Sequence, residues 1–418
     1  MCLHWLFDKR DAMNNENTLR QDARVIGLVG LAHGTSHFYH LILAALIPWL
    51  KPAFGLSYTE LGLLMTVFFV VSGVGQALAG FVVDRVGARA VLFFGMSMLG
   101  VSALVLSRVD SYAGLVAGAL LAGIGNAIFH PADYTLLNQR VSRDRLAHGF
   151  SVHGISGNIG WAAAPIFLTS IAATQGWRAA LLWAALLPMA VLALLVLNRA
   201  VLYPDPIKRT AGTAQGGTLG FLKLRAVWLC FGFFLLTAVA LGGIQSFATI
   251  SLESLYGISH ALATSSYTAY MLASALGMVA GGFLGAHSKQ HDRTVAAAFA
   301  AAALLALVLA AGAGPSWMAL PLMGLIGLCS GVAGPSRDLM IRAAAPQGAT
   351  GRVYGVVYSG LDSGLAIGPL LFGLVMDAGR PGWVFAGVAL FQALAIATAV
   401  GVGGSTRARQ AGTAGQAA

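Results

Sequence analysis

Three histidines share one long apolar segment near the start of the sequence, and their spacing places them on one side of a helix. At 100° per residue, His33, His37 and His40 fall within an arc of about 60°. Histidine, with an ordinary pKa of about 6.5, loads and unloads protons near neutral pH. The three side chains therefore predict a polar face that carries protons or binds a polar ligand. The alternative is a set of hydrogen-bonded structural histidines.

Four further ionisable residues lie inside later apolar segments. His130 and Asp133 are one helical turn apart, and Pro131 between them is expected to bend the helix and free a carbonyl. Because an ionisable group in hydrocarbon is costly, such residues mark a path or a partner. We predict that Asp133, Arg337 and Asp362 form a charge relay in which Asp133 pairs with Arg337. The alternative places Asp133 and Arg337 at a solvated rim.

The elements that must position these side chains are transmembrane helices. Of the 418 residues, 57% are hydrophobic and only 10% are charged, against roughly 25% charged in soluble domains. Twelve apolar segments reach the length of about 17 to 25 residues that a helical span requires. The sequence thus predicts an all-α integral membrane protein with twelve transmembrane helices, at residues 25–50, 61–83, 90–107, 112–137, 147–172, 179–198, 226–252, 264–287, 295–313, 318–341, 353–376 and 383–403.

The distribution of basic residues predicts the orientation. With both termini in the cytoplasm, all of the 25 Lys and Arg residues except Lys51, Arg108, Arg178 and Arg380 fall on or near the cytoplasmic side, as the positive-inside rule requires. We expect a multi-pass protein of a bacterial-type cytoplasmic (inner) membrane. The charged N-terminus lacks a cleavage site of small residues, so we expect no cleaved signal peptide, and Met13 is an alternative start.

The chain divides into two halves of six spans. A polar, Pro- and Gly-containing break predicts a cytoplasmic linker at 200–225 between six-helix bundles at 25–199 and 226–403, with cytoplasmic tails at 1–24 and 404–418. A shift of 204 residues aligns unusual positions of the two halves, among them Asp133 with Arg337 and Asn158 with Asp362.

The same shift aligns small residues and prolines in spans four, five and eleven. Small residues four apart form a face that lets membrane helices approach closely. The predicted packing and bending residues are Pro131, Gly160, Ala164, Pro165, Gly360, Gly364, Gly368 and Pro369.

A short charged turn separates the second and third spans. It contains Gly80, Asp84, Arg85, Gly87 and Arg89. We expect Gly80 to allow close helix contact, Asp84 to pair with an arginine or a helix end across the interface between halves, and the arginines to reach carboxylates or lipid phosphates. The alternative is a topology anchor only.

This turn, in a chain of six plus six spans, resembles the signature loop of the major facilitator superfamily (MFS). The resemblance implies the MFS fold, two bundles related by a pseudo-twofold axis, and a role for the turn in a cytoplasmic gate. The stretch 129–134, followed by His148 and His153, is similar to fosmidomycin-resistance-type exporters of bacteria. The expected membrane arginine of many drug:proton antiporters is missing from the fourth span.

These features predict a secondary active transporter that moves a small molecule by alternating access, with proton-coupled efflux as the first hypothesis. Uptake of a small organic anion is the alternative, and a non-transporting sensor or membrane enzyme is a third. We expect no enzyme activity, because hydrolase, zinc-protease and phosphate-loop motifs are missing. Cys2, Cys230 and Cys329 lack ligand spacing, and we expect no metal, no cofactor and no nucleic-acid partner, and a monomer surrounded by lipid.

Overall fold

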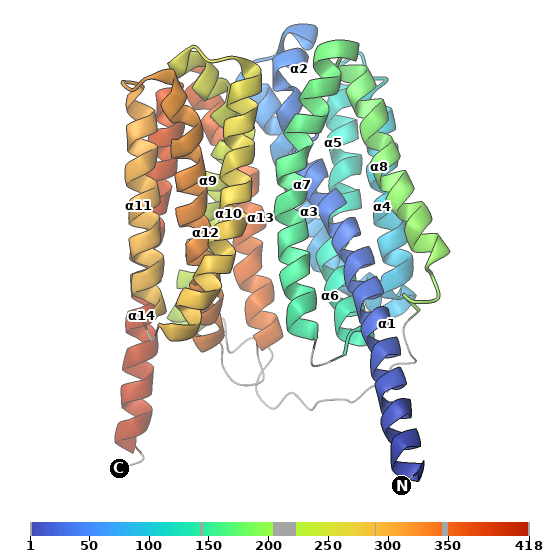
Figure 1. Ribbon diagram of the computed structural model, residues 1–418. Coiled ribbons are helices and arrows are strands. Elements are labelled where there is room, and N and C mark those ends of the chain that lie inside the picture. The colour runs from blue at the N-terminus through green and yellow to red at the C-terminus, as the bar shows by residue number, and fades with distance from the viewer. Residues whose placement is uncertain (1, 143–144, 204–222, 289, 345–349, 417–418) are drawn as a thin grey trace.

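The computed structural model describes residues 2–142, 145–203, 223–288, 290–344 and 350–416. These residues form helices and their connections, and the described chain contains no strand (Figure 1). The helices are α1 (Cys2–His40), η1 (Ala44–Leu46), α2 (Ile47–Phe54), α3 (Tyr58–Val86), α4 (Ala88–Leu106), α5 (Tyr112–Asn126), α6 (Phe129–Arg140), α7 (Leu146–Gln175), α8 (Trp177–Leu197), α9 (Arg225–Tyr256), α10 (His260–His287), α11 (His291–Ala311), η3 (Ser316–Met318), α12 (Ala319–Ala344), α13 (Thr350–Asp377) and α14 (Gly382–Gln416).

Among the described residues, eleven spans are long and apolar enough to cross a membrane. The predicted first span, 25–50, is the exception. It is not one continuous helix, because α1 ends at His40 and η1 and α2 follow. It nevertheless packs inside the bundle against α7. The helix α1 also begins at Cys2, so the predicted tail boundary at residue 24 does not coincide with a helix end.

Two groups of helices stand side by side, one built from α1–α8 and one from α9–α14 (Figure 1). They meet through two helix pairs, α3 with α13 and α7 with α10. A shift of 204 residues carries α3 onto α10 and α7 onto α13. The two contacts are therefore related by the internal repeat, and the all-α fold has the predicted pseudo-twofold arrangement. Most of the predicted linker, residues 204–222, lies outside the described residues.

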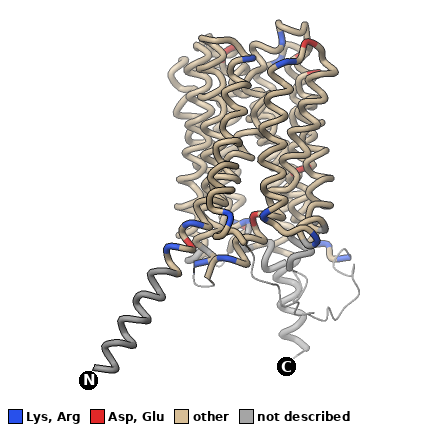
Figure 2. Tube along the Cα trace, turned by 90° about the vertical axis from the view of Figure 1, so that its right-hand side faces the viewer, with Lys and Arg blue, Asp and Glu red and all other residues tan. Residues whose placement is uncertain are grey.

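Both ends of the chain lie at the same end of the molecule, which we call the terminal face (Figure 1). Many of the described lysine and arginine residues lie at this face (Figure 2). Asp22 of α1 accepts hydrogen bonds there from Ser142 and from the guanidinium of Arg145. Burial raises the pKa of Asp22, but these hydrogen bonds and the charge of Arg145 more than compensate, and its pKa lies below the ordinary value.

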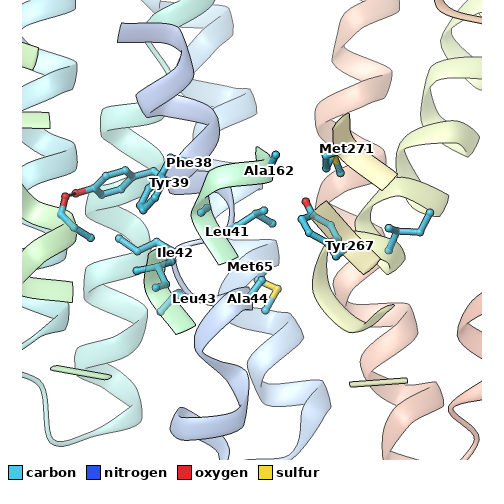
Figure 3. Packing of buried hydrophobic residues seen from close by; sticks show 14 of the residues in the cluster. Phe38, Tyr39, Leu41, Ile42, Leu43, Ala44, Met65, Ala162, Tyr267 and Met271 are labelled. Carbon is cyan, nitrogen blue, oxygen red and sulfur yellow. Dashed lines mark hydrogen bonds between the residues drawn. The ribbon is translucent and has the colours of Figure 1, made fainter. Parts of the chain in front are cut away.

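A continuous hydrophobic cluster crosses the interface between the two halves. Tyr267 and Met271 of α10 lie opposite Leu41 and Ala162 of the other half (Figure 3). Tyr267 is almost fully buried. The polar residues described below therefore lie in a closely packed apolar interior.

Candidate functional site

Two spans of the first bundle are interrupted at the same polar region. Beyond His40 the chain continues as η1, whose first residue Ala44 cannot receive the helical hydrogen bond from position 48, because Pro48 has no N–H. Pro131 likewise cannot donate to Ala127, which lies in the break between α5 and α6. The interruption lies where Pro131 was predicted to free a carbonyl, and a bend of the helix remains a prediction. Broken membrane helices expose backbone groups where a ligand or ion binds.

A fully buried carboxylate lies on α6, within two turns of the break between α5 and α6. Asp133 Oδ2 accepts a hydrogen bond from His153 Nε2 at 3.2 Å and lies 3.3 Å from His33 Nδ1. The rings of His33 and His153 are stacked, with centroids 3.4 Å apart. Asp133 therefore does not form the predicted pair with Arg337, whose guanidinium lies over the ring of Phe234. Each residue is directed into its own bundle, so the repeat aligns them in sequence without bringing them together.

The histidines of α1 lie on one face, as predicted from their spacing. The ring centroids of His33 and His37 are 4.3 Å apart, and those of His37 and His40 are 4.8 Å apart. Trp161 of α7 stacks on His37 and donates its indole N–H to His40 Nδ1 at 3.2 Å. His40 Nε2 lies 3.2 Å from the side-chain oxygen of Asn126. The row of imidazoles therefore has partners on both neighbouring helices.

One hydrogen-bonded chain joins this cluster to the other half of the molecule. His130 Nδ1 donates to Gln76 Oε1 at 2.7 Å, and Gln76 Nε2 donates to Asp362 Oδ2 at 2.9 Å. Asp362 approaches α3 closely at Gly73, where a Cβ would lie 3.1 Å from the Cβ of Asp362. The predicted site residues His130 and Asp362 are thus linked through Gln76, a residue that the sequence did not single out.

Glycines on α7 make room for the histidine row. A Cβ on Gly160 would lie 2.1 Å from the carbonyl oxygen of Gly34, so α1 and α7 are in backbone contact. A Cβ on Gly157 would lie 2.5 Å from His37 Nδ1. Side chains at these two positions would push α7 away from the imidazoles. Ala164, the next small residue of the predicted face, is fully buried.

The small-residue face of α13, which the 204-residue shift aligns with that of α7, packs on α9. Cβ atoms at Gly360, Gly364 and Gly368 would lie 2.6, 2.4 and 2.8 Å from backbone oxygens of α9. Gly364 also contacts Ala238. The 204-residue shift aligns Ala238 with Gly34 of the first half. The predicted repeat is therefore present in the helix contacts. Pro369 offers its carbonyl oxygen to Gly62 of α3, where a Cβ would be only 2.3 Å away.

The charged turn after α3 differs in part from the prediction. Gly80 has open space around it, so close helix packing is the wrong role for it in this structure. The glycine whose backbone conformation matters here is Gly87, which has φ +91° between the end of α3 and the start of α4. That conformation is unfavourable for residues with a side chain.

The contacts of the arginines in this turn also differ from the predicted ones. Arg89 donates to the carbonyl oxygen of Arg199 at 3.1 Å and lies over the ring of Tyr203, so it ties α4 to the end of α8 within one bundle. Arg85 is exposed. The side chain of Asp84, the residue expected to cross the interface, lies outside the described residues. Its gating role remains a prediction.

The face opposite the chain ends is closed by a contact between the halves. At the end of α13, the Asp377 carboxylate accepts hydrogen bonds from the backbone N–H groups of Tyr58 and Thr59, both at 2.8 Å, and from the Thr59 hydroxyl. These donors are the first residues of α3. Gly373 packs beside them on the carbonyl oxygen of Tyr58. An anion is therefore held on a helix N-terminus, which favours negative charge.

Two cavities accompany this arrangement. A small one of about 20 Å³ lies beside the break in α1, and its lining includes Pro165, Gln245 and Tyr267. A larger one of about 710 Å³ lies between α7 and α10, towards the terminal face, and its lining includes Ile155 and Met278. The halves are thus joined by Asp377 at one face and separated by a cavity near the other.

Sequence reasoning did not place four members of the polar cluster in the candidate site, namely Gln76, Asn126, His153 and Trp161. His153 had a usable signal, because residues 153, 157, 160 and 164 follow the helical spacing of the small-residue face on α7. Gln76 and Asn126 had none, since single amides in apolar segments are compatible with many environments.

Two bundles related by an internal repeat, with polar residues at broken helices, are the arrangement found in membrane transport proteins. A family model described as Major Facilitator Superfamily matches residues 29–369 and 246–416, and the chain belongs to this family. It is therefore a multi-pass membrane transport protein and not an enzyme.

Known relatives cover much of the chain at low identity. The chain is 24% identical over 266 residues to the fosmidomycin resistance protein of Escherichia coli, covering 62% of this chain and 64% of that protein, slightly less than two thirds of its length. It is 28% identical over 335 residues to the probable nitrate/nitrite transporter NarK2 of Mycobacterium tuberculosis, covering 77% and 81%.

A similar solved structure is that of a bacterial homologue of the human lysosomal transporter Spinster, in an inward-facing and occupied conformation. It has a TM-score of 0.69 and 14% identity, and the match covers 92% of this chain and 96% of that one. This likeness shows the shared fold.

Proposed function

We propose that this protein is a monomeric, proton-coupled exporter of a small molecule in the cytoplasmic membrane, with both termini in the cytoplasm. The observation that carries the proposal is the chain Asp362–Gln76–His130, which connects an acid of one half to the histidine cluster of the other. In alternating access the two halves rock against each other around a central site. A titratable contact between halves therefore links proton occupancy to conformation.

Asp362 is the proton carrier of this proposal. Gln76 of α3 is its one polar partner among the described residues, with His130 of α6 behind it, and none of the ion pairs in the described chain includes Asp362. An ionised carboxylate accepts a hydrogen bond roughly twice as strong as a neutral acid does. Protonation of Asp362 thus weakens its bond to Gln76 and favours separation of α3 from α13 at this level.

The histidine cluster is the substrate region of the proposal. His33, His37 and His40 lie on the last two turns of α1, and Leu41, the next residue, lines the cavity between the two halves. A proton entering down a potential of ~100 mV releases about 2.3 kcal/mol, which suffices to drive a useful gradient of exported substrate. Arg337 is only a secondary candidate for the cavity wall. Its guanidinium lies over the ring of Phe234, so the side chain is directed into the second bundle.

The direction of transport distinguishes two candidate functions. Similarity to a protein named for fosmidomycin resistance favours export. Similarity to a protein named as a probable nitrate/nitrite transporter favours the alternative, uptake of a small anion. Right-side-out and inside-out membrane vesicles with an imposed pH gradient separate the two. Accumulation in inside-out vesicles with an acidic interior supports export, and accumulation only in right-side-out vesicles with an acidic exterior supports uptake.

The test of proton coupling uses purified protein in proteoliposomes that contain a pH-sensitive dye. Substrates are first chosen by screening an overexpressing and a deletion strain across toxic compounds and carbon sources. We expect substrate-driven proton movement in the wild type, and its loss in Asp362→Asn with substrate exchange at equal pH retained.

The matched control is Asp292→Asn. Asp292 is also a buried acid of the second half, but it lies at the start of α11 against Gly403 of α14, away from the interface. Its variant should move protons as the wild type does. Full substrate-driven proton movement in Asp362→Asn would contradict the proposed coupling.

A further inference from the structure

Three imidazoles of the polar cluster converge from two helices. His33 and His37 come from α1, and His130 comes from α6. One ring nitrogen of each lies within 4.8 Å of the corresponding nitrogens of the other two. The three rings are mutually inclined, by 51° for His33 and His37, 68° for His33 and His130, and 64° for His37 and His130. Inclined rings can each turn an in-plane lone pair towards one point, and the short distances between the three nitrogens are what favours such a point here.

The ring separations fit ligands around one ion. A tetrahedral metal with metal–nitrogen bonds of about 2.0–2.1 Å places ring centroids roughly 5 Å apart. The observed centroid separations are 4.3, 5.3 and 6.5 Å. These separations lie on both sides of the tetrahedral value. His33, Asp133 and His153 also place one ligand atom each within 4.8 Å of one another. The centroids of the stacked His33 and His153 rings are only 3.4 Å apart, too close for two ligands of one ion, so Asp133 and His153 are assigned to the surroundings of the metal.

One of the three rings has the hydrogen bond that metal-binding histidines make through their second nitrogen, and another lies near a carboxylate without a hydrogen bond to it. A ligating imidazole typically directs its other nitrogen towards a carboxylate or a carbonyl oxygen, which fixes the ring orientation. His33 Nδ1 lies near Asp133 Oδ2, and His130 donates from Nδ1 to Gln76 Oε1. In both residues Nε2 is the nitrogen left for an ion.

The surrounding charges and unsatisfied atoms also favour a cation. His33 Nδ1, His37 Nδ1 and Asp133 Oδ1 are buried and lack a hydrogen-bond partner among the described residues. Buried polar atoms without partners are uncommon in native proteins and indicate an occupant that is not part of the chain. Asp133 contacts His33 directly, and Asp362 reaches His130 through Gln76. Two carboxylates thus stand behind two of the ligands and offset a double positive charge.

We propose that His33, His37 and His130 bind a divalent transition-metal cation of the Zn²⁺, Co²⁺ or Ni²⁺ class. Three neutral nitrogens without thiolate or several carboxylates suit these ions better than Mg²⁺ or Ca²⁺. Three protein ligands leave a fourth position for water or for a donor atom of a bound compound. The inference rests on the proposed function in one respect. If this cluster is the substrate region, the substrate class is such a cation or a compound that carries it. The proposed metal site departs from the sequence-based expectation that the protein binds no metal.

The binding test uses the purified full-length protein in detergent. Co²⁺ is titrated by visible absorption, because four-coordinate Co²⁺ has intense and characteristic bands, and Zn²⁺ is titrated by calorimetry. We expect one ion per chain. His37→Gln removes a ligand and should weaken binding by at least 100-fold. Gln76→Leu removes only the contact behind His130 and should weaken it 10- to 100-fold.

The matched control is His148→Gln, because His148 is an exposed histidine at the start of α7. It should bind like the wild type, and thermal unfolding confirms that each variant is folded. A wild-type protein that binds neither ion overturns the proposal, and so does equal affinity in His37→Gln and His148→Gln.

Transport measurements separate this inference from the proposed function. Proteoliposomes with an internal zinc indicator and an imposed pH gradient report Zn²⁺ movement, and the pH dye reports protons. Proton-coupled transport of another compound, together with no metal binding, overturns the metal site and leaves proton-coupled transport supported. Metal binding that requires His37, with no flux driven by the pH gradient, supports the site and contradicts the proposed coupling.

Discussion

Removal of the Asp377 carboxylate is expected to open the face opposite the chain ends. Asp377 at the end of α13 binds the first two backbone N–H groups of α3 and the Thr59 hydroxyl, and these helices belong to different halves. The contact exists only while the halves are closed at this face. Its loss in Asp377→Ala therefore acts on the balance between the two conformations, whereas each half keeps its own packing.

The magnitude follows from the kind of contact. Replacing an aspartate that caps a helix N-terminus by alanine costs about 0.5–2 kcal/mol, and attraction to the helix dipole at an exposed site is part of that range. Asp377 is exposed, so water takes over part of its hydrogen bonding when the halves separate. We therefore expect a shift of about 1–2 kcal/mol, equivalent to a 5- to 30-fold change in the ratio of closed to open molecules.

The assay is double electron–electron resonance between spin labels on the loop after α4 and the loop before α12. These two loops lie at the face opposite the chain ends, in different halves (Figure 1). Asp377→Ala should increase the population at long distances. Glu60→Gln is the control, because Glu60 lies at the same helix end but its carboxylate binds only Ser57 of its own half. Identical distance distributions in the wild type and Asp377→Ala would refute the reasoning.

Three further predictions concern packing, the charged turn and pH. Gly160→Leu should reduce the yield of folded protein by gel filtration, because even a Cβ would lie 2.1 Å from the Gly34 carbonyl oxygen and overpacking costs about 1–3 kcal/mol or more. Gly87→Ala should lower the thermal unfolding temperature and Gly80→Ala should not, since only Gly87 has positive φ and a strained backbone costs roughly 1–3 kcal/mol. Asp22→Asn should destabilise the protein at pH 7, by about 1–3 kcal/mol. The lowered pKa of Asp22 means that its contribution is present above the unfolded-state pKa of about 3.9 and disappears as pH falls through the folded-state value. Wild-type and Asp22→Asn melting temperatures should thus converge in strong acid, and a difference that persists there would contradict the assignment.

The fold was predictable because hydrocarbon permits few structures. A chain with twelve apolar segments must satisfy its backbone hydrogen bonds within helices, and the repeat then relates its halves. The break after His40 was harder to predict, because a proline eight residues later is compatible with an uninterrupted span. The structure shows that the interruption coincides with the end of the histidine row.

The candidate site was predictable only where its residues share one helix. The common face of His33, His37 and His40 follows from helical geometry alone. The partner of Asp133 did not follow, because the repeat relates positions in two bundles and says nothing about their distance. Arg337 is equivalent to Asp133 by the repeat, yet each residue contacts side chains of its own bundle. Equivalent positions face each other only if they lie on the pseudo-twofold axis.

The two halves carry different parts of the polar cluster, and this asymmetry has a consequence for mechanism. Asn158 in the first half aligns with Asp362 in the second, whereas the 204-residue shift replaces the three histidines of α1 by residues that do not titrate, namely Thr237, Leu241 and Ile244. One half therefore carries the imidazoles, and the other carries the acid that reaches them through Gln76. In a symmetric pair, both halves would bind the same ligand in the same way. In the proposed mechanism, a ligand bound by the first half and a proton bound by the second would meet at the contact through Gln76. A change at either one would then alter the stability of the interface between the halves.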